Sequence, residues 1–266
     1  MLKRLRVELL FLRALAGVNL ASAMEYRASF ISQIVGMFIN NGIYFVFWLI
    51  FFNRFGGVRG YALGDIYLLF AVVTLAYGLA FMFAGNTGPF LAQIIAQGRL
   101  DYYLVFPRNL LLHVIFSRMT VSTIGDLTFG LAAFLFTGRV NWPTFGLFLL
   151  VSGLSALVLV AFNIIGGSLA FYMGNAQYAS EQMSNAILTF SLYPHTLFSG
   201  TARFILYTLV PAAFVGAVPV EIIRSGALHS LPWLIAAAAT AWGLAMLLFY
   251  AGLRRYESGS AINVNL

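Results

Sequence analysis

The stretch GDIYLLFAVVTLAYGLAFMFA, residues 64–84, decides the fold of this chain, because Asp65 is its only charged residue. Further apolar runs lie near residues 28–53, 109–137, 146–172, 184–198 and 232–250. A helix of roughly 20 apolar residues spans about 30 Å of hydrocarbon and satisfies its own backbone N–H and C=O groups there. Most of the runs reach that length, so the sequence predicts six transmembrane helices.

The composition agrees with a membrane protein. Hydrophobic residues make up 61% of the chain and charged residues 9%, whereas an ordinary soluble domain has about 25% charged residues. The apolar runs are continuous and do not alternate with polar residues, which argues against a transmembrane β-barrel. We therefore expect an all-α integral membrane protein with one domain over residues 1–266: an interfacial helix at 1–27, a six-helix membrane domain at 28–250 and a tail at 251–266.

Several kinds of chemistry are disfavoured by composition. The chain has no cysteine, which excludes disulfides and thiolate metal sites. Its histidines, His113, His195 and His229, are scattered without a second ligand at helical spacing, so no metal site is predicted. The net charge of +7 does not predict nucleic-acid binding, because the basic residues lie at the ends of apolar runs, where they set orientation.

The distribution of basic residues predicts that both termini lie in the cytoplasm. With six spans, the nine basic residues on the side of the termini are Lys3, Arg4, Arg6, Arg13, Arg27, Arg99, Arg108, Arg254 and Arg255. The five on the other side are Arg54, Arg59, Arg139, Arg203 and Arg224. Cytoplasmic segments carry the excess of basic residues in membrane proteins.

The first 27 residues have two interpretations. A secretory signal requires an uninterrupted apolar core, and Glu8 and Arg13 interrupt it here. On a helix, apolar side chains form one stripe flanked by Arg6 and Arg13: Leu2, Leu5, Leu9, Leu12, Ala16 and Leu20. We therefore expect an interfacial helix on the cytoplasmic leaflet, with its basic residues near anionic lipid headgroups.

In the connection after the second span, the sequence predicts a short amphipathic helix over residues 89–97, and residues 98–101 end it. Its apolar face, with Phe90, Leu91 and Ile94, favours burial against a partner, since exposing such a face to water gains nothing. A plain connection between two spans is the alternative.

Residues 199–231 predict a re-entrant hairpin. The apolar stretch 206–218 is short for a span, and Pro211 and Pro219 interrupt it. A seventh full span would also place Arg254 and Arg255 outside, against the distribution of basic residues. We therefore expect two short half-helices on the external side.

Several segments together resemble the permease subunits of type-2 ABC exporters, over nearly the whole chain. They are the N-terminal helix leading to EYRASF at 25–30, the segment GRLDYYLVFP at 98–107, and Tyr193-Pro194 followed by Pro211 and Pro219. In that family six helices follow a cytoplasmic connecting helix, and a coupling helix after the second span docks on the ATPase. A re-entrant pair lies between spans five and six.

The resemblance implies a non-catalytic subunit with separate ATPase partners. The sequence has no Gly-x-x-x-x-Gly-Lys-[Ser/Thr] loop for nucleotide phosphates, and Lys3 is its only lysine. ATP and Mg²⁺ would therefore bind two partner ATPase subunits, and a second permease, identical or a related sister chain, would complete the unit in a prokaryotic inner membrane. The implied ATPase-facing residues are Phe90, Ile94, Gly98, Arg99, Leu100 and Asp101, and Glu25 and Arg27 are expected to brace the connecting helix against the first span.

Polar residues inside the predicted spans are candidates for a pathway or for contacts between helices: Asn40, Asn41, Arg118, Asp126 and Asn163. A charged residue at the bilayer centre costs about 2.5–3.5 kcal/mol, so Arg118 and Asp126 should face protein or water. Within one helix they would lie about 12 Å apart, too far to pair with each other. Structural packing and substrate contact both stay open for these residues.

Aromatic and small residues are similarly ambiguous. Tyr44, Phe47, Trp48 and Phe51 fit a lipid-facing belt better than the wall of an apolar path. Gly153, Gly166 and Gly167 are expected to let the fourth span approach its neighbours closely.

Three function classes follow. The first is an exporter permease for a hydrophobic or amphiphilic substrate such as a drug, lipid, glycolipid or peptide-like molecule. The second is an ion- or proton-coupled secondary transporter, with Asp126 and Glu181 as candidate proton carriers, although the sequence shows no internal repeat. The third is a membrane-embedded lipid-modifying enzyme, which would need clustered carboxylates, whereas the eight acidic residues are dispersed.

Overall fold

The computed structural model describes residues 2–55 and 60–257, with side chains from residue 6 onward, and this part of the chain is helical without strands. The prediction of an all-α integral membrane protein is confirmed. Arg59, tail residues 258–266 and the side chains of Lys3 and Arg4 lie outside the described part. The helices are α1 Leu2–Met24, α2 Arg27–Phe55, α3 Leu63–Phe83, α4 Pro89–Ala96, α5 Asp101–Leu104, α6 Leu110–Phe116, α7 Thr123–Leu135, α8 Trp142–Ser168, α9 Ala170–Met173, α10 Gln177–Ser191, α11 Gly200–Thr208, α12 Ala217–Ser225 and α13 Leu231–Leu253, with 3-10 turns η1 His195–Leu197, η2 Ala212–Phe214 and η3 Leu228–Ser230.

Five helical segments in the described part are long and apolar enough to cross a membrane: Arg6–Met24, Arg27–Phe55, Leu63–Phe83, Trp142–Met173 and Leu228–Leu253. The last four correspond to predicted runs. The first falls within α1, which was expected to lie along the leaflet. The segment Arg6–Met24 has the length and apolarity of a membrane span, and its most apolar 18 residues are not buried against the rest of this chain.

The predicted run 184–198 does not form a span of its own. Its helix, α10, begins earlier, at Gln177, and ends at Ser191 before Pro194. Helix α10 has only 15 residues, and polar Gln177, Glu181 and Gln182 occupy its first turns, so it is too short and too polar for an apolar span.

The predicted third span, 109–137, is wrong as one continuous helix. It is divided into α6 and α7 by residues 117–122, which are not helical. Backbone groups of this break bond to the end of α3: the Gly85 N–H donates to the Arg118 carbonyl at 3.0 Å, and the Thr120 N–H donates to the Phe81 carbonyl at 3.3 Å. The helix can break here because neighbouring backbone supplies the missing hydrogen bonds.

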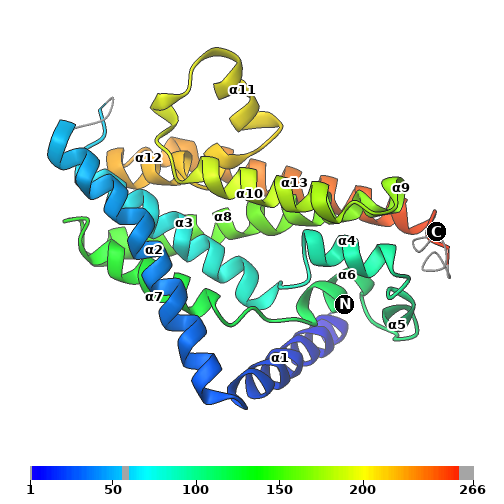
Figure 1. Cartoon of the computed structure of the whole chain (residues 1–266). Helices are drawn as coiled ribbons and strands as arrows, with labels where there is room; N and C mark the ends of the chain where they lie inside the picture. Colours follow the sequence, from blue (N-terminus) through cyan, green and yellow to red (C-terminus); the bar gives the residue numbers. More distant parts are fainter. Residues whose placement is uncertain (1, 56–59, 258–266) are drawn as a thin grey trace.

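Helix α3 forms the centre of the bundle (Figure 1). Every residue from 68 to 76 is buried, so no face of this stretch is open to lipid or water. It packs against α2, α7, α8 and α12. A helix that is apolar on all sides suits either a protein core or a membrane span, and α3, which neighbouring helices surround, has no polar face in its sequence.

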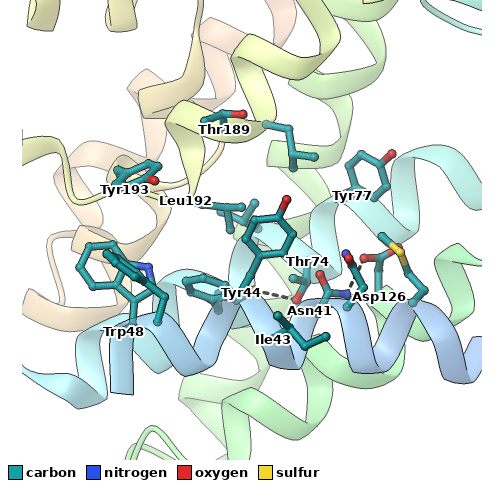
Figure 2. Close-up of a pocket in the computed structure, with 16 residues that line it drawn as sticks. Asn41, Ile43, Tyr44, Trp48, Thr74, Tyr77, Asp126, Thr189, Leu192 and Tyr193 are labelled. Atoms are coloured by element: carbon teal, nitrogen blue, oxygen red, sulfur yellow. Dashed lines mark hydrogen bonds between the residues drawn. The ribbon is translucent and has the colours of Figure 1, made fainter. Parts of the chain in front are cut away.

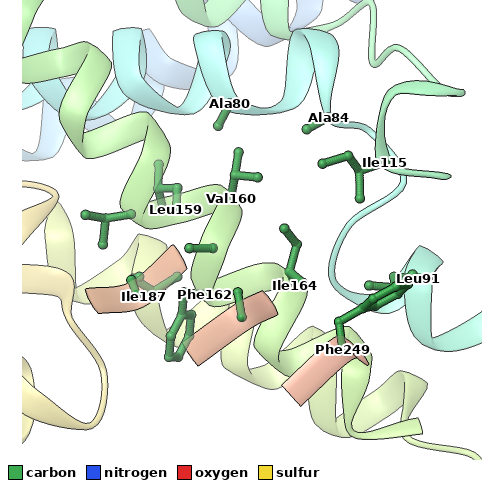
Figure 3. Close-up of a cluster of buried hydrophobic side chains, with 14 of the residues drawn as sticks. Ala80, Ala84, Leu91, Ile115, Leu159, Val160, Phe162, Ile164, Ile187 and Phe249 are labelled. Atoms are coloured by element: carbon green, nitrogen blue, oxygen red, sulfur yellow. The ribbon is translucent and has the colours of Figure 1, made fainter. Parts of the chain in front are cut away.

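A second buried cluster joins α4 to the bundle (Figure 3). Leu91 of α4 is fully buried with Leu159 and Ile164 of α8 and Phe249 of α13. A Cβ atom on Gly167 would lie 2.7 Å from the Leu91 Cβ, so α8 and α4 can touch only because residue 167 is glycine. Gly153, in contrast, has nothing within 4 Å of an added Cβ, and its predicted close approach is wrong in this chain.

The two half-helices expected in residues 199–231 are present as α11 and α12. They are bent by 68° at a break around Pro211, and their hydropathy fits either a broken span or a re-entrant loop. In Figure 1, α11 stands apart from the bundle while α12 lies against it. Packing of α12 on α3 and α8 anchors this segment.

We predict that Gly130→Ala destabilises the protein and that Gly153→Ala does not. A Cβ on Gly130 of α7 would lie 2.8 Å from the Leu75 nitrogen and 2.9 Å from the Ala71 oxygen, both backbone atoms of α3. Separating the two helices should cost about 1–3 kcal/mol. Thermal unfolding of the purified protein, followed by intrinsic fluorescence in one detergent, measures the difference. Equal unfolding temperatures for the two variants would contradict the α3–α7 contact.

Candidate functional site

A cavity of about 500 Å³ lies between α2, α3, α7 and α10 (Figure 2). This volume falls within the roughly 300–1,000 Å³ of pockets that hold small organic ligands. Its wall is formed by Met37, Asn40, Asn41, Ile43, Tyr44, Phe47, Trp48, Phe70, Val73, Thr74, Tyr77, Asp126, Leu188, Thr189, Leu192 and Tyr193. The wall is mostly apolar and aromatic, with few polar groups.

The structure brings two predicted polar residues together in this wall. The Asn41 amide of α2 donates a hydrogen bond to Asp126 Oδ1 of α7 at 2.7 Å, and both side chains are buried. Asp126 Oδ2 has no hydrogen-bond partner among the described residues. Asn40 also lines the cavity, but it is exposed on the outer side of α2. Asn41 and Asp126 thus join α2 to α7 and give the cavity its polar end.

The aromatic residues of α2 line the cavity in large part. Tyr44, Phe47 and Trp48 belong to the wall, while Phe51 does not. Tyr44 and Phe47 are also more than half exposed in this chain. The belt interpretation therefore does not account for all four residues, because three of them border a pocket.

Asn163 and Arg118 lie elsewhere, at the start of α4. The Asn163 amide donates to the Leu159 carbonyl, and its Oδ1 accepts from the Ser184 hydroxyl of α10. The Gly88 N–H donates to the Asn163 carbonyl at 3.1 Å. Asn163 therefore connects α4, α8 and α10.

Arg118 is outside the helices, contrary to its predicted place within the third span. It belongs to the break between α6 and α7, where its guanidinium carbon lies 3.8 Å from the ring centroid of Phe90. This cation–π contact gives the Arg118 charge, which the sequence had predicted to lie inside a membrane-spanning helix, a partner in the Phe90 ring.

The short helix predicted over residues 89–97 is present as α4, and it ends as expected. Gly98 has φ +69°, and the N–H groups of Gly98 and Arg99 bond to the Ile95 and Ile94 carbonyls. Glycine accommodates this left-handed end of a helix without steric cost. The apolar face of α4 is covered by this chain's own α8 and α10, and not left open for a partner.

The six residues implied as ATPase-facing differ in exposure. Two are buried in the core (Ile94 and Leu100), two are half-buried (Gly98 and Asp101) and two are exposed (Phe90 and Arg99). The exposed surface next to them consists of Gln97, Arg99, Tyr102, Leu104, Val105 and Phe106, which we call the α4–α5 tip. The signal for it in the sequence was YYLVFP at 102–107, an apolar segment too short to span.

Asp101, at the base of the α4–α5 tip, interacts with the end of the chain. It lies beside Tyr256, which follows α13. Burial, together with the neighbouring Asp101 carboxylate, raises the pKa of Tyr256 to about 12. The α4–α5 tip and the end of α13 are therefore in contact.

Glu25 and Arg27 are exposed at the bend between α1 and α2, and neither forms an ion pair or a side-chain hydrogen bond with another described residue. Their bracing role stays a prediction. Helix α1 also contacts α6, through Phe11 against His113, and the segment before α6, through Glu8, which lies 3.8 Å from Arg108.

Sequence analysis missed a second polar cluster, which we call the Asp65 clamp: Asp65, Arg139 and Arg224. Asp65, in the first turn of α3, is buried and accepts a hydrogen bond from Arg139 at 3.0 Å, and Arg224 of α12 lies 3.6 Å away. The signal was present, because Asp65 is the only charge in the run 64–84. Its partners, however, are far along the chain.

Beside the clamp, Tyr61 and His195 lie in hydrogen-bond contact at 3.2 Å. Burial, and then the Glu221 carboxylate, raises the pKa of Tyr61 to about 12. Burial, and then the Arg203 charge, lowers the pKa of His195. Both groups are therefore held in their neutral forms near neutral pH, which suits the contact between them.

Comparison with known families matches residues 38–260 to the family described as ABC-2 family transporter protein. No curated protein and no solved structure gives a match to the chain. The family match covers α3 through α13 and the last 18 of the 29 residues of α2. It includes α4, the Asp65 clamp and the wall of the cavity except Met37. The protein thus belongs to the ABC-2 family of transporters and is a multi-pass membrane protein of the transport-permease type.

Proposed function

We propose that this chain is the membrane-spanning, non-catalytic permease subunit of an ATP-driven exporter. The family match over residues 38–260 carries the proposal. The chain would form the translocation path for a hydrophobic or amphiphilic molecule such as a drug, lipid, glycolipid or peptide-like compound. Separate ATPase subunits would bind ATP and Mg²⁺. The expected location is the inner membrane of a prokaryote, with both termini in the cytoplasm.

The cavity is the proposed point of contact with the substrate. Its wall is mostly apolar, which favours a hydrophobic or amphiphilic ligand over a sugar or a small ion. One side of the cavity is formed by α2, whose Ile43, Tyr44 and Phe47 are also exposed on the outside of the bundle. A second permease, identical or a sister chain, would cover these residues and close the path.

The α4–α5 tip is the proposed ATPase-docking surface. Tyr102 is 64% exposed and Val105 77% exposed, and Arg99 supplies a charge beside them. Exposed apolar residues grouped with a charged one are typical of interaction sites on proteins. Buried Ile94 and Leu100 would act behind this surface by fixing it to the bundle.

A continuous path of contacts leads from the α4–α5 tip to the cavity. Helix α4 packs against α10, and Asn163 links the start of α4 to Ser184 of α10. Leu188, one turn after Ser184, lines the cavity. A shift of α4 driven by an ATPase would therefore move α10 and change the cavity, as coupling between two states requires.

We predict that the chain purified from its native membrane carries an ATPase partner. Affinity purification in mild detergent, followed by native mass spectrometry, should show two nucleotide-binding subunits with two permeases, and the complex should hydrolyse ATP. A lone chain without ATPase activity would contradict the proposal. Proton-driven transport that Asp126→Asn abolishes would then support the secondary-transporter alternative.

We predict that Asp101→Lys uncouples ATP hydrolysis from transport while the permease stays folded. Reversing this charge removes the interaction of the α4–α5 tip with Tyr256 at the end of α13. Transport in reconstituted vesicles should fall at least tenfold, with ATP hydrolysis retained. Glu257→Lys, at an exposed neighbour, makes the same change of net charge and should transport normally. Normal transport by Asp101→Lys would discard the coupling role.

A further inference from the structure

The charge distribution in the cavity is one-sided. Among the described residues that line it, Asp126 is the only one with a formal charge, and none is Lys, Arg or His. The described ion pairs join other residues: Glu8 with Arg108, and Asp65 with Arg139 and Arg224. The cavity thus contains an acidic group without a cationic counterpart.

Asp126 is bonded through only one of its oxygens. Asn41 donates to Oδ1, while Oδ2 is buried and accepts no hydrogen bond from the described residues. Only 2% of Asp126 is exposed. If Asp126 had a purely structural role, both of its oxygens should accept hydrogen bonds, because buried carboxylates are normally paired or fully hydrogen-bonded. The unpaired oxygen adds negative potential to this end of the cavity, and negative potential attracts a positive ligand.

The remaining wall suits a cation as well. Tyr44, Phe47, Trp48, Tyr77 and Tyr193 contribute aromatic rings to the cavity. The faces of aromatic rings attract cations, and Trp and Tyr do so more strongly than Phe. A carboxylate combined with several aromatic rings is therefore a wall that favours organic cations and disfavours anions of the same shape.

The two ends of the cavity differ in character. Figure 2 shows Asn41, Thr74, Tyr77 and Asp126 at one end, and Trp48 and Tyr193 at the other. Trp48 and Tyr193 pack with ring centroids 5.8 Å apart. A ligand with a positive group and an apolar body would match both ends at once.

We infer that the cavity selects cationic amphiphiles, with the positive group at the Asp126–Asn41 end and the apolar body against Trp48 and Tyr193. As an assignment of cargo, this inference rests on the proposed transport function. The claim that the cavity binds cationic amphiphiles rests on the residues of the cavity alone.

Binding of two ions of matched shape tests the inference. Tetraphenylphosphonium and tetraphenylborate are close in size and opposite in charge. The full-length protein, with whatever subunits accompany it, is placed in nanodiscs of zwitterionic phosphatidylcholine, and binding is measured by equilibrium dialysis against empty nanodiscs. We expect tetraphenylphosphonium to bind at least tenfold more tightly than tetraphenylborate.

Variants assign the preference to Asp126. Asp126→Asn keeps an oxygen to accept from Asn41 and should weaken phosphonium binding at least tenfold, without weakening tetraphenylborate. Asp126→Glu keeps the charge and should retain the preference for the cation. Glu181→Gln removes an exposed acidic group of α10 that does not line the cavity, and should bind as the wild type does.

Three binding results would overturn the inference: tighter binding of tetraphenylborate by the wild type, an unchanged preference in Asp126→Asn, or equal losses for Asp126→Asn and Glu181→Gln. If Asp126→Asn does not fold, the wild type and Asp126→Glu still decide the sign of the preference. ATP-driven transport without cation preference would overturn this inference and leave the proposed function intact. Cation preference in a chain that has no ATPase partner would overturn the proposed function and leave this inference intact.

Discussion

Backbone N–H and C=O groups outside a helix need other hydrogen-bond partners within a membrane domain. The architecture of this protein depends on how the backbone of residues 117–122 obtains those partners. The end of α3 supplies the partners, through Phe81 and Gly85. The break lets α6 contact α1 and α5 while α7 packs along α3. As a result Asp126 lies beside Asn41, and Arg118 lies over Phe90, at separate places in the fold.

Hydropathy predicted most of the architecture, because the cost of burying backbone in lipid depends mainly on the length of an apolar run. Runs 28–53, 64–84, 146–172 and 232–250 became α2, α3, α8 with α9, and α13. Hydropathy did not predict the break at residues 117–122 within the apolar run 109–137, because hydrogen bonds to the end of α3, distant in the sequence, stabilise that break. It also failed at α10, since packing against α4 and α8 stabilises a helix too polar to qualify alone.

The candidate site was only partly predictable, for a different physical reason. Composition identifies Asn41 and Asp126 as costly in a membrane, but their hydrogen bond joins residues 85 positions apart. Such pairing depends on how helices cross, which a single sequence does not specify. Asp65 shows the same limit: its charge stands out at the start of α3, while Arg139 and Arg224 reach it from distant segments. Local features, such as the end of α4 at Gly98, were predicted correctly because they depend on neighbouring residues alone.

The covered apolar face of α4 has a consequence for how the protein is made. Leu91, Ala92, Ile94 and Ile95 are already buried against this chain's own helices. A newly synthesised copy can therefore bury the apolar face of α4 without help from another subunit. If the proposed function holds, synthesis of this chain need not be synchronised with that of an ATPase subunit, because the apolar face of α4 is covered without it.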